Sequence, residues 1–98
     1  MAIASINPTT GKTIKTYSAL TSDQIEQALT QAQAAFLSYP KVSFAQRQQW
    51  MHKAAAGLLA RKDDFGRTMT LEMGKTLKSA IAEVEKCAWV CQYYADEA

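Results

Sequence analysis

Two thiols and one imidazole are the side chains of this chain best suited to nucleophilic or metal chemistry. Cys87 and Cys91 are four residues apart, so a helix would place them on one face, and His52 is the only histidine. A zinc site needs three or four ligands, and no further Cys or His completes the set. Neither thiol has a base at a suggestive spacing. The sequence therefore predicts no catalytic residue and no metal ligand, with His52 at the surface and both cysteines packed in the interior.

The run Gly74-Lys75-Thr76 is a second candidate because it resembles the end of a phosphate-binding loop. The full pattern needs another glycine five residues earlier, after a strand, but position 69 is methionine in a helical pattern. We therefore predict no cofactor-binding residue in this chain. Three acidic residues nearby are spaced as solvated helix charges rather than as an acid/base pair: Glu72, Glu83 and Glu85.

Apart from His52, these candidates lie on or next to the final stretch, residues 76–98, around which the chain is organised. Its apolar residues recur at alternating steps of four and three, which predicts one buried helical stripe. The opposite side includes Trp89 and Tyr93. These two large aromatic side chains present more apolar surface than a solvent-exposed helix face usually carries. The helix is therefore expected to need a partner on both sides. The stripe is Leu77, Ile81, Val84, Ala88, Cys91 and Ala95, and the opposite side is Ala82, Lys86, Trp89 and Tyr93.

The end of this helix lacks the usual stop signals. No Gly or Asn follows it, and Asp96 and Glu97 lie where the helix dipole favours cations. We therefore expect the natural chain to continue beyond Ala98.

Residues 1–20 predict a β-hairpin, with strands near 3–6 and 13–17 around a turn at Asn7–Lys12. Residues 21–98 are predicted to form helices. Thr21 and Gln24 form a capping box that begins the first helix, and Pro40 ends it. Its predicted buried stripe is Ile25, Ala28, Leu29, Ala32, Phe36 and Tyr39.

Ser43, with Gln46, begins the next predicted helix, which runs to about Arg61. A short helix then begins at Asp63 or Asp64 and ends at Gly74 as a C′ glycine. The expected fold is mainly α with a short N-terminal β-hairpin (α+β), with three to four helices in one segment, 1–98. The predicted core faces of these two helices are Trp50, Met51, Ala54, Leu58 and Leu59, and Phe65, Met69 and Met73.

Composition limits the possible classes. The apolar fraction is 48%, as in globular proteins, and the net charge is only +2. The basic excess lies in residues 1–62. These residues contain no cluster of Lys and Arg with interleaved aromatics, so the sequence does not predict nucleic-acid binding. The sequence shows neither a signal peptide nor an apolar run of about 20 residues. Cys87 and Cys91 have poor disulfide geometry on one helix, so we expect a reduced, cytoplasmic protein without membrane contact.

Five short segments, in order, resemble the N-terminal fifth of NAD(P)-dependent aldehyde dehydrogenases. The similarity is greatest to the succinate-semialdehyde dehydrogenase branch, particularly its bacterial members. It covers essentially the whole chain, with Thr76 where the family commonly has proline, and threonine can still cap a helix. The segments are Ile6–Gly11 (INPTTG), Ala34–Phe36 (AAF), Ser43–Arg47 (SFAQR), Leu71–Lys75 (LEMGK) and Glu83–Ala95 (EVEKCAWVCQYYA).

The resemblance implies the N-terminal part of an aldehyde dehydrogenase cofactor-binding domain. The full-length enzyme would oxidise an aldehyde, with succinate semialdehyde favoured, using NADP or NAD. The family's catalytic residues lie further along, so this chain alone is expected to be inactive. Its implied partners are the remainder of the enzyme chain, other copies in a homo-oligomer and a small aldehyde. Matching positions place Ala82 and Lys86 near the mouth of the substrate tunnel, where Lys86 would attract an acidic aldehyde or simply be a solvated lysine.

Two alternatives remain from the sequence. One is a stand-alone helical protein-interaction module, which a reading frame ending at Ala98 would favour. The other is a nucleic-acid-binding bundle that uses the basic first half, for which salt-dependent DNA binding would be needed.

Overall fold

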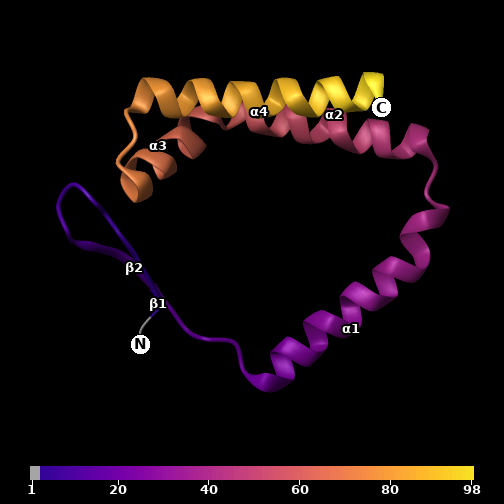
Figure 1. Cartoon of the computed structure of the whole chain (residues 1–98), viewed down its shortest axis with the longest axis horizontal. Helices are drawn as coiled ribbons and strands as arrows, with labels where there is room; N and C mark the ends of the chain where they lie inside the picture. The colour runs from indigo at the N-terminus through magenta and orange to yellow at the C-terminus, as the bar shows by residue number, and fades with distance from the viewer. Residues whose placement is uncertain (1–2) are drawn as a thin grey trace.

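The computed structural model describes residues 3–98, and Figure 1 shows the path of the chain. Residues 1 and 2, which the sequence assigns to the hairpin region, lie outside the described residues. A two-stranded sheet is followed by four α-helices, with a 3₁₀ turn between the first two helices. The elements are β1 (Ile3–Ile6), β2 (Thr13–Tyr17), α1 (Ser22–Ser38), η1 (Tyr39–Lys41), α2 (Phe44–Ala60), α3 (Lys62–Met73) and α4 (Leu77–Glu97). The predicted fold class is confirmed.

The strands β1 and β2 form the predicted antiparallel hairpin. Ile3 pairs with Tyr17, and a bulge shifts the register between Ser5 and Ile6. The connecting turn is held by local hydrogen bonds, as the Asn7 side chain accepts from the Thr9 amide at 2.9 Å. Gly11 has a positive φ of 73°, which a residue with a side chain rarely adopts.

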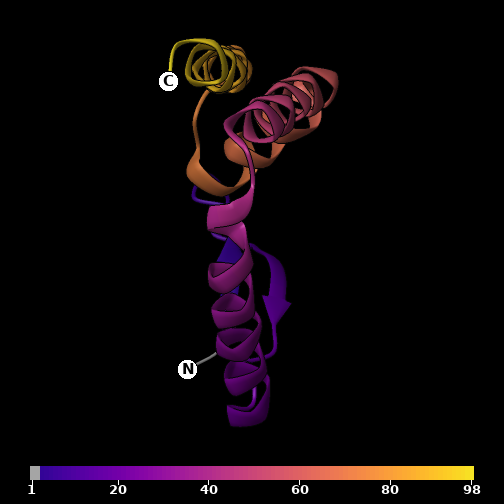
Figure 2. The same cartoon turned by 90° about the vertical axis from the view of Figure 1, so that its right-hand side faces the viewer.

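The capping box at α1 is confirmed. The Gln24 amide donates to Thr21 Oγ1 at 3.2 Å, and the Thr21 amide donates to Gln24 Oε1 at 2.9 Å. The predicted burial of this helix is wrong for the chain as described, because α1 has no buried residue. Phe36, for example, is 67% exposed. The physical reason is that α1 packs mainly on η1, the turn that directly follows it, and extends away from the α2–α3–α4 group (Figure 2).

Helices α2 and α3 follow each other almost without interruption at Arg61. Ser43 Oγ caps α2 as predicted, accepting from the Gln46 amide at 3.1 Å. Helix α3 begins at Lys62, one or two residues before the predicted start at Asp63 or Asp64, and no side chain caps it. Gly74 ends α3 with φ 73°, which confirms the predicted C′ glycine. Helix α1 ends at Ser38, two residues before Pro40, and Pro40 lies in the first turn of η1.

Helix α4 lies along α2 and α3 and supplies most of the core (Figure 1). Small side chains allow the helices to approach closely. A Cβ added to Gly66 of α3 would lie 2.7 Å from Ile81 Cγ1 and 3.2 Å from the Ile81 backbone nitrogen. The buried apolar residues are Ala55 of α2 and Ala80, Val84, Ala88 and Ala95 of α4.

The predicted stripe of α4 is largely confirmed, with one correction. Val84, Ala88 and Ala95 are buried, whereas Leu77 at the start of the helix is 45% exposed. Ala80 takes its place in the core. Ile81 and Cys91 are half-buried.

The predicted core face of α2 needs a larger correction. Ala55 is buried in place of Ala54, while Trp50 and Leu59 are 45% and 41% exposed. Two predicted residues, Met51 and Leu58, are half-buried. Ala55 lies one helical turn from each of them, so the buried side of α2 overlaps the predicted one and is rotated toward Ala55. In α3, Phe65 and Met69 are half-buried as well, but Met73 at its end is 76% exposed.

The chain is more open than a compact domain of its size. Its radius of gyration is 17.6 Å, where about 13 Å is typical of 100 compact residues. Its accessible surface is 7925 Å². A compact monomer of 10.8 kDa exposes roughly 5,500 Å², so about 2,400 Å² is in excess. Much of the surface that a globular protein buries is therefore uncovered here. None of the helices in the described part of the chain combines the length and the apolar character of a membrane span.

Candidate functional site

The outer face of α4 carries the two residues predicted to lie near a substrate tunnel. Ala82 and Lys86 are both exposed, one helical turn apart. Lys86 also lines a shallow hollow of about 420 Å³. The hollow is lined by Glu83, Lys86, Cys87, Val90 and Cys91, and we call it the thiol hollow.

Two aromatic rings extend this face toward the end of α4. Trp89 is 60% exposed and Tyr93 is 52% exposed. Tyr93 makes an edge-to-face contact with Tyr94, with ring centroids 5.3 Å apart. The prediction that the chain leaves this side of α4 uncovered is confirmed for residues 3–98.

The two thiols do not have the buried positions that the sequence predicted. Cys87 is exposed, and Cys91, one turn further on, is half-buried. Both are free cysteines that open into the thiol hollow. Within residues 3–98, no group of three or more His, Cys, Asp or Glu residues is placed to hold a metal ion.

His52 lies at the surface, as predicted, but it has a partner that its sequence neighbourhood does not reveal. Its Nε2 is 2.9 Å from Asp96 Oδ1, and Gln48 Nε2 donates to the same oxygen at 3.4 Å. The pair connects α2 to the last turn of α4. Both side chains are about half exposed, so solvent screens the attraction. No nearby residues in sequence could signal this contact, because 44 positions separate the two groups.

The three glutamates are solvated, as predicted, and each also links two elements. Glu85 of α4 is 3.5 Å from Lys62 Nζ at the start of α3. Glu83 pairs with Lys75 in the loop that precedes α4. Glu72 of α3 accepts a hydrogen bond of 2.6 Å from the Ser5 hydroxyl of β1, which joins the hairpin to the helices. These groups have structural roles rather than the geometry of an acid/base pair.

The run Gly74-Lys75-Thr76 has only local structural roles. Gly74 ends α3, and Thr76 caps α4 by accepting from the Ser79 amide at 3.4 Å. Lys75 is engaged by Glu83. The surroundings are helical, as the sequence predicted. These residues do not form the strand, loop and helix that would hold a nucleotide phosphate, so we assign no cofactor contact to them.

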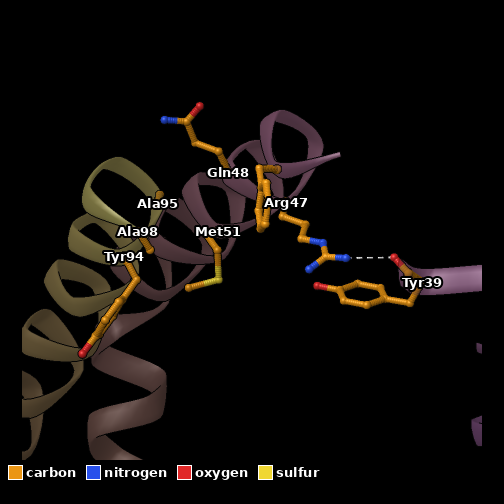
Figure 3. A pocket seen from close by; sticks show the side chains of 8 residues that line it. Tyr39, Arg47, Gln48, Met51, Tyr94, Ala95 and Ala98 are labelled. Atoms are coloured by element: carbon orange, nitrogen blue, oxygen red, sulfur yellow. Dashed lines mark hydrogen bonds between the residues drawn. The ribbon is translucent and has the colours of Figure 1, made fainter. Parts of the chain in front are cut away.

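A second hollow, of about 280 Å³, lies where α2 begins and α4 ends (Figure 3). Arg47 dominates it. Its Nη2 donates to the Tyr39 carbonyl oxygen at 3.0 Å, and its guanidinium lies 4.3 Å from the Tyr39 ring centroid and 5.4 Å from that of Phe44. Met51 and Ala95 complete an apolar wall. The two rings and the carbonyl hold the cation against the junction of α1 and α2.

Comparison with known proteins shows what this arrangement is similar to. The model of the aldehyde dehydrogenase family matches residues 1–98. A probable NADP+-linked succinate-semialdehyde dehydrogenase of Synechocystis sp. is 51% identical over 98 residues, which cover 100% of this chain and 22% of that protein. The NADP+-linked succinate-semialdehyde dehydrogenase 1 of Mycobacterium tuberculosis is 48% identical, with 100% and 21% covered. The chain thus spans about a fifth of the length of these relatives.

Solved structures have the same fold. The succinic semialdehyde dehydrogenase of Streptococcus pyogenes, in complex with NADP+, matches with a TM-score of 0.90 and 29% identity, covering 98% of this chain and 21% of that one. An NAD-dependent aldehyde dehydrogenase of Sinorhizobium meliloti matches with a TM-score of 0.85 and 29% identity, covering 99% and 20%. The resemblance inferred from five short segments is confirmed by both comparisons.

Proposed function

Because the chain belongs to the aldehyde dehydrogenase family, we propose that it is the N-terminal part of an enzyme that oxidises succinate semialdehyde to succinate. The observation that carries the proposal is the match over all 98 residues to succinate-semialdehyde dehydrogenases, at 51% and 48% identity. The proposed site of action is the cytoplasm.

We propose that this part of the chain packs against the rest of the enzyme and borders the entrance through which the substrate reaches the active site. Among the hydrogen bonds found in residues 3–98, none joins Cys87 or Cys91 to a base, and Gly74–Thr76 do not form a nucleotide cradle. A bound nicotinamide cofactor would accept hydride from the substrate. We propose NADP+, because both named relatives use it, while the similar NAD-dependent structure keeps NAD+ as the alternative.

The excess surface supports the proposed partners. The uncovered faces of α1 and α4 expose large apolar side chains, including Leu29 at 58% and Trp89 at 60%. About 2,400 Å² of excess surface is within the range that stable interfaces cover. We propose that the rest of the enzyme chain, and other copies in a homo-oligomer, cover these faces.

Lys86 is the proposed substrate-attracting residue, with Ala82 beside it at the mouth of the tunnel. The ion pairs found among the described residues do not involve Lys86, and it borders a hollow rather than a helix contact. An ammonium group at an opening raises the local concentration of an anionic aldehyde. Ala82 adds no bulk one turn away.

A chimera tests the proposed function. The matching segment of the Synechocystis relative is replaced by this chain, and reduction of NADP+ is followed with succinate semialdehyde as substrate. We expect turnover near that of the parent, and none from the 98-residue chain alone. A chimera that assembles into the parent's oligomer but has lost turnover would contradict the proposal. A protein that misassembles is distinguished by sedimentation, and it would contradict the proposed partner surfaces.

Lys86→Glu in the same chimera tests the role of the lysine. A screened surface charge is worth ~0.2–1 kcal/mol, so we expect kcat/KM for succinate semialdehyde to fall by a few-fold. An uncharged aldehyde should be unaffected, because it has no charge to attract. Lys78→Glu, on the same helix, is the matched control. Equal losses with both aldehydes, or with both variants, would refute the role of Lys86.

A further inference from the structure

We infer that Cys87 and Cys91 form a chelating site for a trivalent arsenical that carries one organic group. The inference rests on the thiol hollow alone and is independent of the proposed enzyme activity. The two cysteines are free, lie one turn apart on α4 and open into the same hollow. One thiol is exposed and the other half-buried, so a ligand reaches the first and is then held against the helix by the second.

The spacing selects the type of ligand. Side chains at i and i+4 of a helix have Cβ atoms about 5–6 Å apart. A disulfide needs Cβ atoms about 3.5–4.5 Å apart, so the two sulfurs do not suit a direct bond. A single atom between them removes this conflict, because two bonds to a thiophilic centre of about 2.3 Å each allow the sulfurs to stay well separated. The pair therefore fits a one-atom bridge.

The surroundings favour an arsenical over a metal ion. No third Cys, His or carboxylate in residues 3–98 is placed to complete a metal site. Trivalent arsenic with one organic substituent needs only two sulfurs from the protein. The hollow of about 420 Å³ beside the thiols has space for the substituent, with Val90 as an apolar contact. A bare ion would leave that space unused.

The reaction balances without an oxidant. Phenylarsine oxide, C₆H₅AsO, reacts with two thiols to give C₆H₅As(SR)₂ and one water. Two As–S bonds form as the arsenic–oxygen bond breaks, and the two thiol protons leave with the oxygen. Arsenic stays trivalent and neither sulfur is oxidised.

The test measures retention of phenylarsine oxide by the 98-residue chain in the presence of excess glutathione, a monothiol. Intact mass reports the adduct, free-thiol titration reports the thiols consumed, and circular dichroism reports the helix. We expect one phenylarsenic group per chain and the loss of both thiols. Cys87→Ser and Cys91→Ser should each lower retention by about tenfold or more, because a second tethered thiol acts at high effective concentration.

A composition-preserving swap separates helix geometry from mere proximity in sequence. Lys86→Cys with Cys87→Lys places the thiols five positions apart, about 140° around the helix. Both positions are exposed, so the swap does not disturb packing. In native buffer the swap should retain several-fold less arsenical than the parent, whereas in denaturant the two should be equal. Equal retention in native buffer, or a parent that retains no more than the single variants, would overturn the inference.

Discussion

Gly66→Ala is expected to destabilise the contact between α3 and α4, although alanine is the better helix former. Gly66 lies inside α3 and is buried against α4. The added Cβ would meet Ile81 Cγ1 at 2.7 Å, and the Ile81 backbone nitrogen and Cα at 3.2 and 3.3 Å. The Cγ1 atom can rotate away, but the two backbone atoms move only if the helices separate.

Gly57→Ala is the matched control for the magnitude. Gly57 lies inside α2, and an added Cβ would have no heavy atom within 4 Å. Replacing a helical glycine stabilises by about 1 kcal/mol when nothing interferes. Overpacking a close contact costs about 1–3 kcal/mol, so Gly66→Ala should range from neutral to about 2 kcal/mol less stable. The difference between the two variants, about 1–3 kcal/mol, isolates the contact with Ile81.

Thermal unfolding followed by circular dichroism at one protein concentration measures this difference. For a chain of this size, 1 kcal/mol corresponds to about 4–8 °C in Tm, so Gly66→Ala should melt several degrees below Gly57→Ala. Ile81→Ala removes the Cγ1 atom, and the double variant should recover part of the loss caused by Gly66→Ala. Equal stabilisation by Gly57→Ala and Gly66→Ala would refute the close approach of α3 and α4.

Two further outcomes follow from the same structure. Gly74→Ala should cost about 1–2 kcal/mol of unfolding free energy in urea, because φ is 73° and the new Cβ would lie 3.1 Å from Pro8 Cγ. Gly11→Ala has the same φ but no neighbour within 4 Å, so a loss no larger at Gly74 than at Gly11 would exclude any contribution from Pro8. The isolated chain should also self-associate, because its excess surface of about 2,400 Å² includes Trp89, and Trp89→Gln should weaken association. Sedimentation of a compact monomer at high micromolar concentration would contradict this.

Local chemistry explains the parts of the fold that were predictable. Thr21, Ser43 and Gly74 each act within one turn of their own position, through a hydroxyl that caps a helix or a backbone with positive φ. The spacing of apolar residues on α4 likewise indicated its buried side correctly at Val84 and Ala88. Family membership was also evident, because it depends on the order of short segments rather than on contacts.

The candidate site was less predictable. Cys87 and Cys91 were identified as candidates from the sequence. Their exposure depends on where α2 packs against α4, which cannot be predicted from the sequence of α4 alone. The same holds for His52 and Asp96, which meet across 44 positions. The role of Lys86 stays a prediction.

The sequence by itself determined, to within two residues, where α1, α2 and α3 begin and end, and which family the chain resembles. Only the tertiary structure decided which face each helix buries. Apolar periodicity marks a side that is able to pack, but burial requires a second element within reach. Helix α4 finds α2 and α3, so Val84 is buried. Helix α1 has an equally apolar stripe, yet Leu29 and Phe36 stay exposed because no element among the described residues lies across from them.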